Sequence, residues 1–195
     1  VEASRDFENT KNLYIEGDNL DALKLLQESY LGKVKMIYID PPYNTGHDFV
    51  YHDNFTVKAS EYQDNAIDED GDQIISEDEF LENSKANGRF HSDWLSMIYP
   101  RLKVARNLLS DDGVIFISID ENEMVNARNI CNEIFGEDNF VANLVWTNKE
   151  GGGSSDSRLF RIKHEYILCY AKSIDLLEIE GLPISNAERY KESDE

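Results

Sequence analysis

One stretch decides the fold of this chain: Met36-Ile37-Tyr38-Ile39-Asp40-Pro41-Pro42-Tyr43-Asn44. The residues from Val34 to Ile39 form an apolar and β-branched run that has the length of a buried strand. The run stops at Asp40, and two prolines follow, so Asp40 is predicted to lie where a central strand ends. In an α/β sheet, the carboxyl ends of the strands form the edge at which ligands bind.

The tandem prolines Pro41 and Pro42 predict a stiff turn. Each proline fixes φ at about −65° and has no backbone N–H, so the carbonyl groups of the turn are expected to be free to accept hydrogen bonds. With the carboxylate of Asp40 and the ring of Tyr43, the turn offers two acceptors for an exocyclic amino group and an aromatic face for stacking. These groups suit a planar nucleobase.

The motif Asp40-Pro41-Pro42-Tyr43 resembles motif IV of the amino-methyltransferases, which transfer a methyl group from S-adenosylmethionine to adenine N6 or cytosine N4. The flanking segments, Gly17-Asp18-Asn19-Leu20 upstream and Asn44-Thr45-Gly46 downstream, resemble those of the methylation subunit of type III restriction-modification systems. The alternative interpretation of the motif is an ordinary Pro-Pro turn after a strand. The resemblance covers residues 10–185.

The resemblance implies an α/β fold, a partial Rossmann-like S-adenosylmethionine-dependent methyltransferase fold in which parallel strands end in an antiparallel hairpin. The family has a permuted motif order, with motifs III to VIII first, then a target recognition region, then motifs X and I. No Phe-x-Gly-x-Gly stretch occurs in the 195 residues, so motif I is absent. We therefore interpret 12–172 as the catalytic half of the domain with an acidic insertion at 45–88, 1–11 as a loose arm and 173–195 as a tail towards a missing recognition region. We expect the chain alone to be inactive and to bind S-adenosylmethionine weakly.

The implied activity is site-specific DNA adenine-N6 methylation. The target base is flipped out of the duplex and stacked on Tyr43, and its amino group donates to Asp40 and to the Pro41 carbonyl, beside Pro42. These acceptors localise lone-pair density on the nitrogen, so attack on the methyl group depends on positioning, and no covalent enzyme intermediate is needed. Two alternatives stay open: a cytosine-N4 enzyme, and a non-catalytic remnant that acts only in assembly with a partner.

The resemblance also implies that S-adenosylmethionine contacts Asp18, Asn19, Asp40 and His91. Asp18 has a second interpretation as the N-cap of the following helix, and the two roles can coexist. His91 borders the cofactor pocket or packs the start of a helix, and core packing is the simpler expectation for Trp94.

The formal net charge of −20 argues against DNA binding by this chain alone, because phosphate affinity comes from Lys and Arg. Residues 147–172 differ, since they carry five Lys and Arg against three Asp and Glu, a net charge of +2. The residues expected to contact DNA are Asn44, Lys149, Arg158, Arg161 and Lys163. The family implies three partners for the full-length protein: double-stranded DNA, a second copy in a homodimer, and a restriction subunit with helicase and nuclease activity.

Hydrophobic periodicity and turn residues predict the other elements. They are a short strand from Asn12 to Ile15, a helix from Leu20 to Tyr30, a helix from a Ser92 cap to Leu109 with a kink or late start at Pro100, a turn at 111–113, a strand from Val114 to Ile119, a helix from Glu121 to Phe135, and strands from Phe140 to Trp146 and from His164 to Lys172. The first strand, its helix and the Val34 strand are expected to form a right-handed crossover unit. The last two strands have no helix between them and are most simply antiparallel.

Composition narrows the class of protein further. Cys131 and Cys169 are isolated in apolar segments, so both are interpreted as reduced core residues. No apolar run approaches the roughly 20 residues that a membrane span needs, and the chain opens without a signal-peptide pattern. A soluble cytoplasmic protein without a membrane partner is the default expectation.

The segment Asp68 to Glu79 resembles a calcium-binding EF-hand loop, with acidic residues at positions 1, 3, 5 and 12. The sixth position of such a loop needs a glycine for its sharp turn, and here it is Gln73. An acidic solvated loop is therefore the simpler interpretation, and no metal site is expected.

If this acidic segment is only solvated, millimolar calcium will not raise the melting temperature of the protein beyond the effect of ionic strength. Thermal unfolding with and without calcium measures this. A saturable increase that disappears in Glu79→Gln would show that the segment binds the ion.

Overall fold

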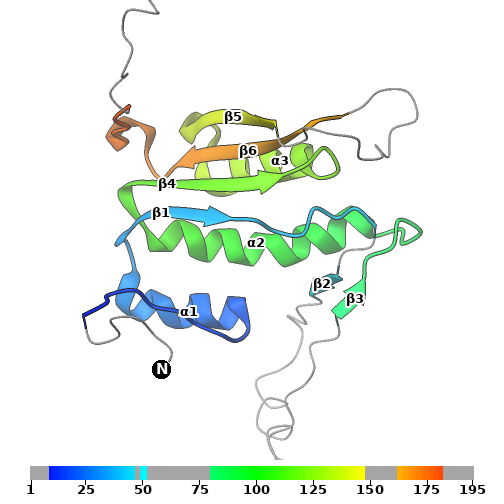
Figure 1. The fold of residues 1–195 in the computed structure, drawn as a ribbon, viewed down its shortest axis with the longest axis horizontal. Coiled ribbons are helices and arrows are strands. Elements are labelled where there is room, and N and C mark those ends of the chain that lie inside the picture. The colour runs from blue at the N-terminus through cyan, green and yellow to red at the C-terminus, as the bar shows by residue number, and fades with distance from the viewer. Residues whose placement is uncertain (1–8, 47–48, 52–79, 148–161, 182–195) are drawn as a thin grey trace, which may run out of the picture.

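The computed structural model describes residues 9–46, 49–51, 80–147 and 162–181. Within these ranges the chain forms a sheet of four strands, two helices that cover one of its faces, and a further helix packed beside them (Figure 1). Residues 1–8 of the arm predicted at 1–11, and the acidic segment at 68–79, lie outside the described residues.

The sheet has the strand order β1-β4-β6-β5. Its strands are β1 (Val34–Ile39), β4 (Leu109–Ile119), β5 (Phe140–Thr147) and β6 (His164–Ala171). β1 and β4 are parallel, whereas β6 is antiparallel to both β4 and β5. The predicted α/β class, with parallel strands followed by an antiparallel hairpin, is confirmed.

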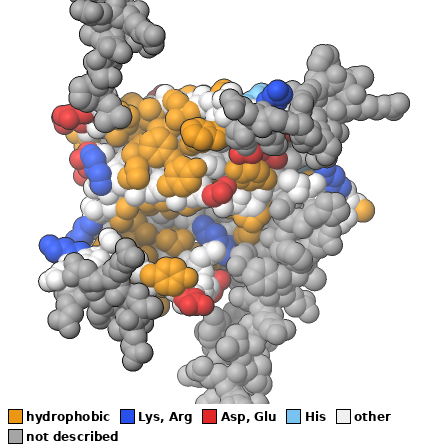
Figure 2. Space-filling model, viewed as in Figure 1, with side chains coloured by type: hydrophobic (Ala, Val, Ile, Leu, Met, Phe, Trp, Pro, Cys, Tyr) orange, Lys and Arg blue, Asp and Glu red, His pale blue; other side chains and the backbone are white. Residues whose placement is uncertain are grey.

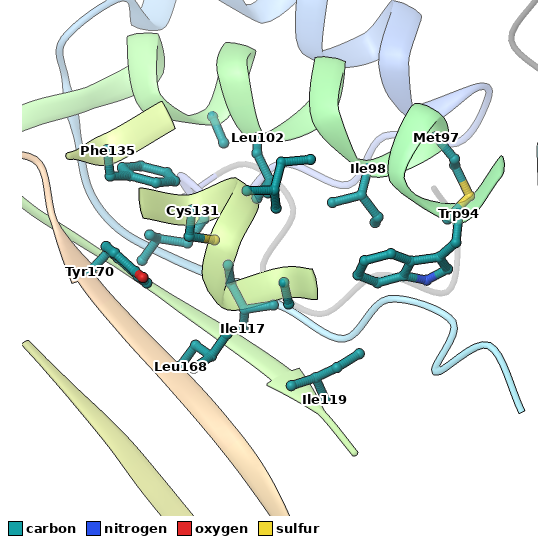
Figure 3. Close-up of a cluster of buried hydrophobic side chains, with 14 of the residues drawn as sticks. Trp94, Met97, Ile98, Leu102, Ile117, Ile119, Cys131, Phe135, Leu168 and Tyr170 are labelled. Atoms are coloured by element: carbon teal, nitrogen blue, oxygen red, sulfur yellow. The ribbon is translucent and has the colours of Figure 1, made fainter. Parts of the chain in front are cut away.

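One face of the sheet is buried under α2 (Phe90–Leu108) and α3 (Met124–Phe135). Alternate residues of β4 point to this face, where Ile115 and Ile119 are 0% exposed and Ile117 is 2% exposed. They pack with side chains from both helices and from β6 (Figure 3): Trp94, Ile98, Leu102, Cys131, Phe135, Leu168 and Tyr170. Each large apolar side chain buried in this way contributes about 1.5–3 kcal/mol to folding, so this layer is the core of the domain.

The opposite face of the sheet carries exposed apolar side chains. Met36 and Tyr38 on β1 are 60% and 56% exposed, and Leu144 and Trp146 on β5 are also exposed. Figure 2 shows hydrophobic side chains gathered over the strands on the side turned to the viewer. The described part of the chain therefore covers one face of its sheet and leaves much of the other open.

The helix predicted from Leu20 to Tyr30 is confirmed as α1 (Asn19–Tyr30), which packs against α2. Its N-cap is Asp18, whose Oδ1 accepts a hydrogen bond from the backbone N–H of Asp21 at 2.8 Å. The strand predicted from Asn12 to Ile15 is wrong, because these residues belong to no strand and their apolar side chains are exposed. A short apolar run does not form a strand without a neighbour to pair with, so the expected crossover unit lacks its first strand.

Several element ends differ from their predicted positions. α2 begins at Phe90 rather than after a Ser92 cap, and it continues through Pro100. The predicted turn at 111–113 is part of β4, and α3 begins at Met124, later than Glu121. α3 ends at the predicted Phe135, and its C-cap is Gly136, whose φ of 93° is one that glycine adopts without strain.

The insertion at 45–88 contains two short strands that the sequence does not predict. β2 (Phe49–Tyr51) and β3 (Phe80–Glu82) pair antiparallel and form a separate sheet beside α2 (Figure 1). Three-residue strands are too short to produce a recognisable alternation of apolar and polar residues. The two ends of the insertion are thereby held together.

Both cysteines are free and buried, as expected for reduced core residues. Burial raises the pKa of the Cys131 thiol to about 12 and that of Cys169 to about 11. Neither thiol is therefore a thiolate at neutral pH, which agrees with a packing role.

The cap at the start of α1 yields a stability prediction. Replacing Asp18 with alanine removes the acceptor for the Asp21 N–H, so the free energy of unfolding is expected to fall by about 1 kcal/mol. Asp18→Asn keeps an acceptor oxygen and is expected to retain most of that stability. Urea unfolding followed by far-ultraviolet circular dichroism measures both, and equal stability of Asp18→Ala and the wild type would contradict the cap.

Candidate active site

The candidate active site lies at the carboxyl ends of the two parallel strands. Ile39 of β1 is paired with Ile117 of β4, so Asp40 leaves the sheet beside Ser118. Asp120 follows the end of β4 in the same way. Because β6 runs antiparallel and pairs Tyr166 with Ile119, its neighbour Glu165 reaches the same edge. Three carboxylate residues from distant parts of the sequence therefore meet at one edge of the sheet.

The turn at Pro41 and Pro42 is attached to the core by Trp94. This indole is 0% exposed, and its Nε1–H donates a hydrogen bond to the Pro42 carbonyl at 2.7 Å. The expected core packing of Trp94 is confirmed, but the expectation that both proline carbonyls are free is wrong for Pro42. The Asp40 residue, at the start of this turn, is exposed.

Tyr43 is half-buried against the core, and its hydroxyl lies among the acidic groups of the edge. The hydroxyl is 3.5 Å from Oε2 of Glu165 and also hydrogen-bonds to Asp40. Burial raises the pKa of the Tyr43 phenol, and the carboxylates of Asp40 and Glu165 raise it further. Tyr43 is therefore a neutral phenol near pH 7, and its ring orientation is tied to the two carboxylates.

Asp120 and Glu165 are site residues that sequence reasoning missed. Burial raises the pKa of Asp120, the negative charges of Glu121 and Glu165 raise it as well, and hydrogen bonds from Asn122 lower it. The position of Asp120, directly after the most strand-like run in the chain, was the available signal. Glu165 had no such signal, because only antiparallel pairing brings the start of β6 to this edge.

Asn44 occupies the interior beneath the turn. Its side chain is 0% exposed, and its Nδ2 donates to Oε1 of Glu123 at 2.6 Å. Its Oδ1 accepts a hydrogen bond from Nδ2 of Asn83 at 2.9 Å. A side chain in this position has no surface for DNA, so the predicted DNA contact by Asn44 is corrected to a structural role. The burial of the Asn44 side chain is the reason for this correction, and the sequence motif alone does not show which of its side chains are buried.

The residues predicted to bind the cofactor occupy two separate positions. Asp18 and Asn19 lie at the start of α1, where Asn19 Oδ1 accepts a hydrogen bond from Nε of Arg101 at 2.7 Å. His91 lies at the start of α2, is 56% exposed, and contacts Oε1 of Glu123 through Nδ1 at 2.6 Å. No hydrogen bond or ion pair of the described residues joins Asp18 to Asp40.

Of the basic residues predicted to contact DNA, the described ranges include only Lys163, which is exposed just before β6. Lys149, Arg158 and Arg161 lie outside the described residues. Within the described ranges, no group of three or more His, Cys, Asp and Glu residues is arranged to hold a metal ion. No helix in those ranges has the length and apolar character to cross a membrane.

Comparison with known proteins agrees with this arrangement. The family model described as DNA methylase matches residues 34–194. The type III restriction-modification enzyme EcoPI Mod subunit of Escherichia phage P1 is 45% identical over 188 residues, which are 96% of this chain and 28% of that protein. The StyLTI Mod subunit of Salmonella typhimurium is 49% identical over 168 residues, covering 85% of this chain and 24% of that protein.

A type II enzyme is also similar: the methyltransferase M.KpnI of Klebsiella pneumoniae is 36% identical over 174 residues, 89% of this chain and 35% of that protein. The chain thus spans about a quarter of the length of the two Mod subunits. With the family model matching most of its residues and the Asp40 turn lying at the carboxyl edge of the sheet, the chain belongs to the DNA methylase family.

Proposed function

We propose that this chain supplies the base-binding side of a DNA methyltransferase that transfers a methyl group from S-adenosylmethionine to N6 of a flipped adenine. The observation that carries the proposal is the exposed Asp40 at the carboxyl end of β1, followed by a proline turn attached to a buried tryptophan. Membership of the DNA methylase family and the similarity to type III Mod subunits support it.

The turn suits an exocyclic amine because one of its carbonyl groups holds the turn in place while other acceptor groups face the amine. Trp94 occupies the Pro42 carbonyl and so holds the backbone of the turn in place. The Asp40 carboxylate and the Pro41 carbonyl are then the two acceptors for the hydrogens of the amine. Acceptors that are already oriented lower the cost of reorganisation as the nitrogen attacks.

Tyr43 completes the base site with an aromatic ring. Its hydroxyl contacts Glu165 and Asp40, which restrains the ring beside the carboxylate that receives the amine. Stacking on an aromatic ring stabilises a base extruded from the duplex. Because the phenol keeps its proton, Tyr43 stacks on the base and takes no part in proton transfer.

The cofactor supplies the methyl group, and the residues present fit its nucleoside end. Asn19 and Asp40 are exposed, Asp18 is partly exposed, and the His91 imidazole is 56% exposed. Carboxylate, amide and imidazole groups at the ends of strands and helices are suitable partners for ribose hydroxyls and an adenine amino group. In this proposal Asp18 is a cofactor contact in addition to the cap of α1.

DNA contact is proposed for the basic segment that precedes β6, with Lys163 at its described end. Its positive charge contrasts with a chain of net charge −20, so phosphate binding by these residues would be concentrated there. By analogy with the relatives named as Mod subunits, we also propose a restriction subunit and a second copy of the protein as partners, and a cytoplasmic location.

Substitution of Asp40 tests the reaction. In the full-length protein that carries this chain, Asp40→Ala is expected to lower the methylation rate by about 100-fold or more, because it removes an acceptor acting on the reacting amine. The assay uses duplex DNA and labelled S-adenosylmethionine, with nucleoside analysis of the product. Asp138→Ala, an exposed aspartate after α3, is the matched control and is expected to keep the wild-type rate.

Methylation by Asp40→Ala near the wild-type rate would contradict the role assigned to this carboxylate. Detection of N4-methylcytosine in place of N6-methyladenine would keep the reaction class and overturn the assignment of the base.

A further inference from the structure

The structure assigns Glu123 as a positioning residue that holds the turn after β1 in its active shape through Asn44. This inference rests on the proposed function and deepens it, because it concerns a residue that lies behind the site rather than in it. Glu123 is the N-cap residue of α3 and is distant from Asn44 in sequence, but the two side chains meet in the interior.

The Glu123 side chain is 0% exposed, which is unusual for a carboxylate. Both of its oxygens have partners: Oε1 lies 2.6 Å from both Asn44 Nδ2 and His91 Nδ1, and Oε2 accepts from Asn126 Nδ2 at 2.7 Å. Oε1 accepts the hydrogen bond from the Asn44 amide, and Nδ1 of His91 lies at hydrogen-bond distance from the same oxygen. A buried polar side chain that is hydrogen-bonded through both of its oxygens favours one geometry of the groups around it.

Asn44 needs the hydrogen bond to Glu123, which we call its anchor, because of its backbone conformation. Its φ is 57°, and it is the only non-glycine residue with positive φ in the part of the chain that the structure describes. Asparagine tolerates this left-handed region better than most residues, but the region remains sparsely populated. Hydrogen bonds to Glu123, to Asn83 and to the Phe90 carbonyl select it here.

The anchor acts on the catalytic groups through a short and stiff piece of chain. Only Pro41, Pro42 and Tyr43 separate Asn44 from Asp40, and both prolines have a fixed φ. Trp94 holds the middle of this piece at the Pro42 carbonyl, and Glu123 holds its end at Asn44. A shift of Asn44 is therefore transmitted to Tyr43 and Asp40 instead of being absorbed by the loop.

The same carboxylate oxygen links the turn to the start of α2. Because His91 and Asn44 share Oε1 of Glu123, the partly exposed imidazole and the turn are held in one arrangement. Asn83, in the insertion, is bonded to the same group of residues, because its Nδ2 donates to Asn44 Oδ1 and also to the Phe90 carbonyl at 2.7 Å. Glu123 therefore joins the turn, the insertion and the first residues of both helices.

The test substitutes Glu123 in the full-length protein and reads both catalysis and structure. Glu123→Gln keeps the shape of the side chain but turns one acceptor into a donor. Facing the Asn126 amide, this donor pushes the side chain out of place and so disturbs the bond that Asn44 makes to the other oxygen. We expect kcat to fall by about 10- to 100-fold with KM for S-adenosylmethionine changed less than about threefold, because an interaction felt at the reacting groups is lost. Hydrogen exchange of the backbone at residues 43–46, followed by mass spectrometry, is expected to become faster.

Two matched variants complete the experiment. Glu133→Gln makes the same chemical change at an exposed position of α3, and its kcat and exchange are expected to equal the wild type. Glu123→Gln combined with Asn126→Asp restores a complementary pair with the carboxylate and amide exchanged, so most of the lost kcat is expected to return. A residue needed only for overall stability would not show an effect confined to kcat and to residues 43–46.

Unchanged exchange at residues 43–46 in Glu123→Gln, or no recovery in the double variant, would overturn the inference. If Glu123→Gln does not fold, Asn44→Gly provides the second variant, since glycine accepts the positive φ and lacks the side chain that bonds Glu123, Asn83 and the Phe90 carbonyl. Wild-type kcat in Asn44→Gly would overturn the inference equally. If the wild-type protein transfers no methyl group, the proposed function fails, and the exchange measurement still decides whether Glu123 holds the turn.

Discussion

Parallel pairing of β1 with β4 is the constraint on which the rest of this structure depends. It places Asp40 and Asp120 at the same edge, because parallel strands end on the same side of a sheet. β4 also carries the alternating isoleucines that pack against α2 and α3 in the core. The core and the candidate site therefore share one strand. β6 then pairs antiparallel with β4 and brings Glu165 to the Asp40 edge. Loss of the β1–β4 register would separate the Asp40 carboxylate from the residues that surround it.

Buried polar groups give this edge its shape. Trp94 and Glu123 are both 0% exposed. Trp94 donates a hydrogen bond to the Pro42 carbonyl of the turn that follows β1, and Glu123 accepts one from Asn44 at the end of that turn. An unpaired polar group in the interior costs about 1–3 kcal/mol, so these bonds strongly favour one conformation of the turn over its alternatives. The exposed residue Asp40 is thereby held through neighbours that lie in the interior.

Sequence patterns predicted the elements whose signals are local and strong. Val34–Ile39 is a strand with the predicted bounds, and the last two strands are antiparallel as expected. The predicted cap at Asp18 is confirmed because a capping side chain and its partner lie within the same turn of helix. The strand predicted at Asn12–Ile15 failed because strand formation requires a partner that a local pattern does not supply. β2 and β3 were missed for the converse reason, since their pairing across the insertion leaves no periodic signal in three residues.

The sequence by itself determined the chemistry of the site: an aspartate at the end of a strand, two prolines that stiffen the turn, and an aromatic ring after them. Backbone stereochemistry and side-chain type are properties of neighbouring residues, so they can be read in order along the chain. Only the tertiary structure decided which residues support that chemistry. It turned Asn44 inward, assigned the Pro42 carbonyl to Trp94, and brought Glu165 and Glu123 to the turn from later segments. Such contacts depend on strand register and on burial, and both are set by the packing of the whole chain.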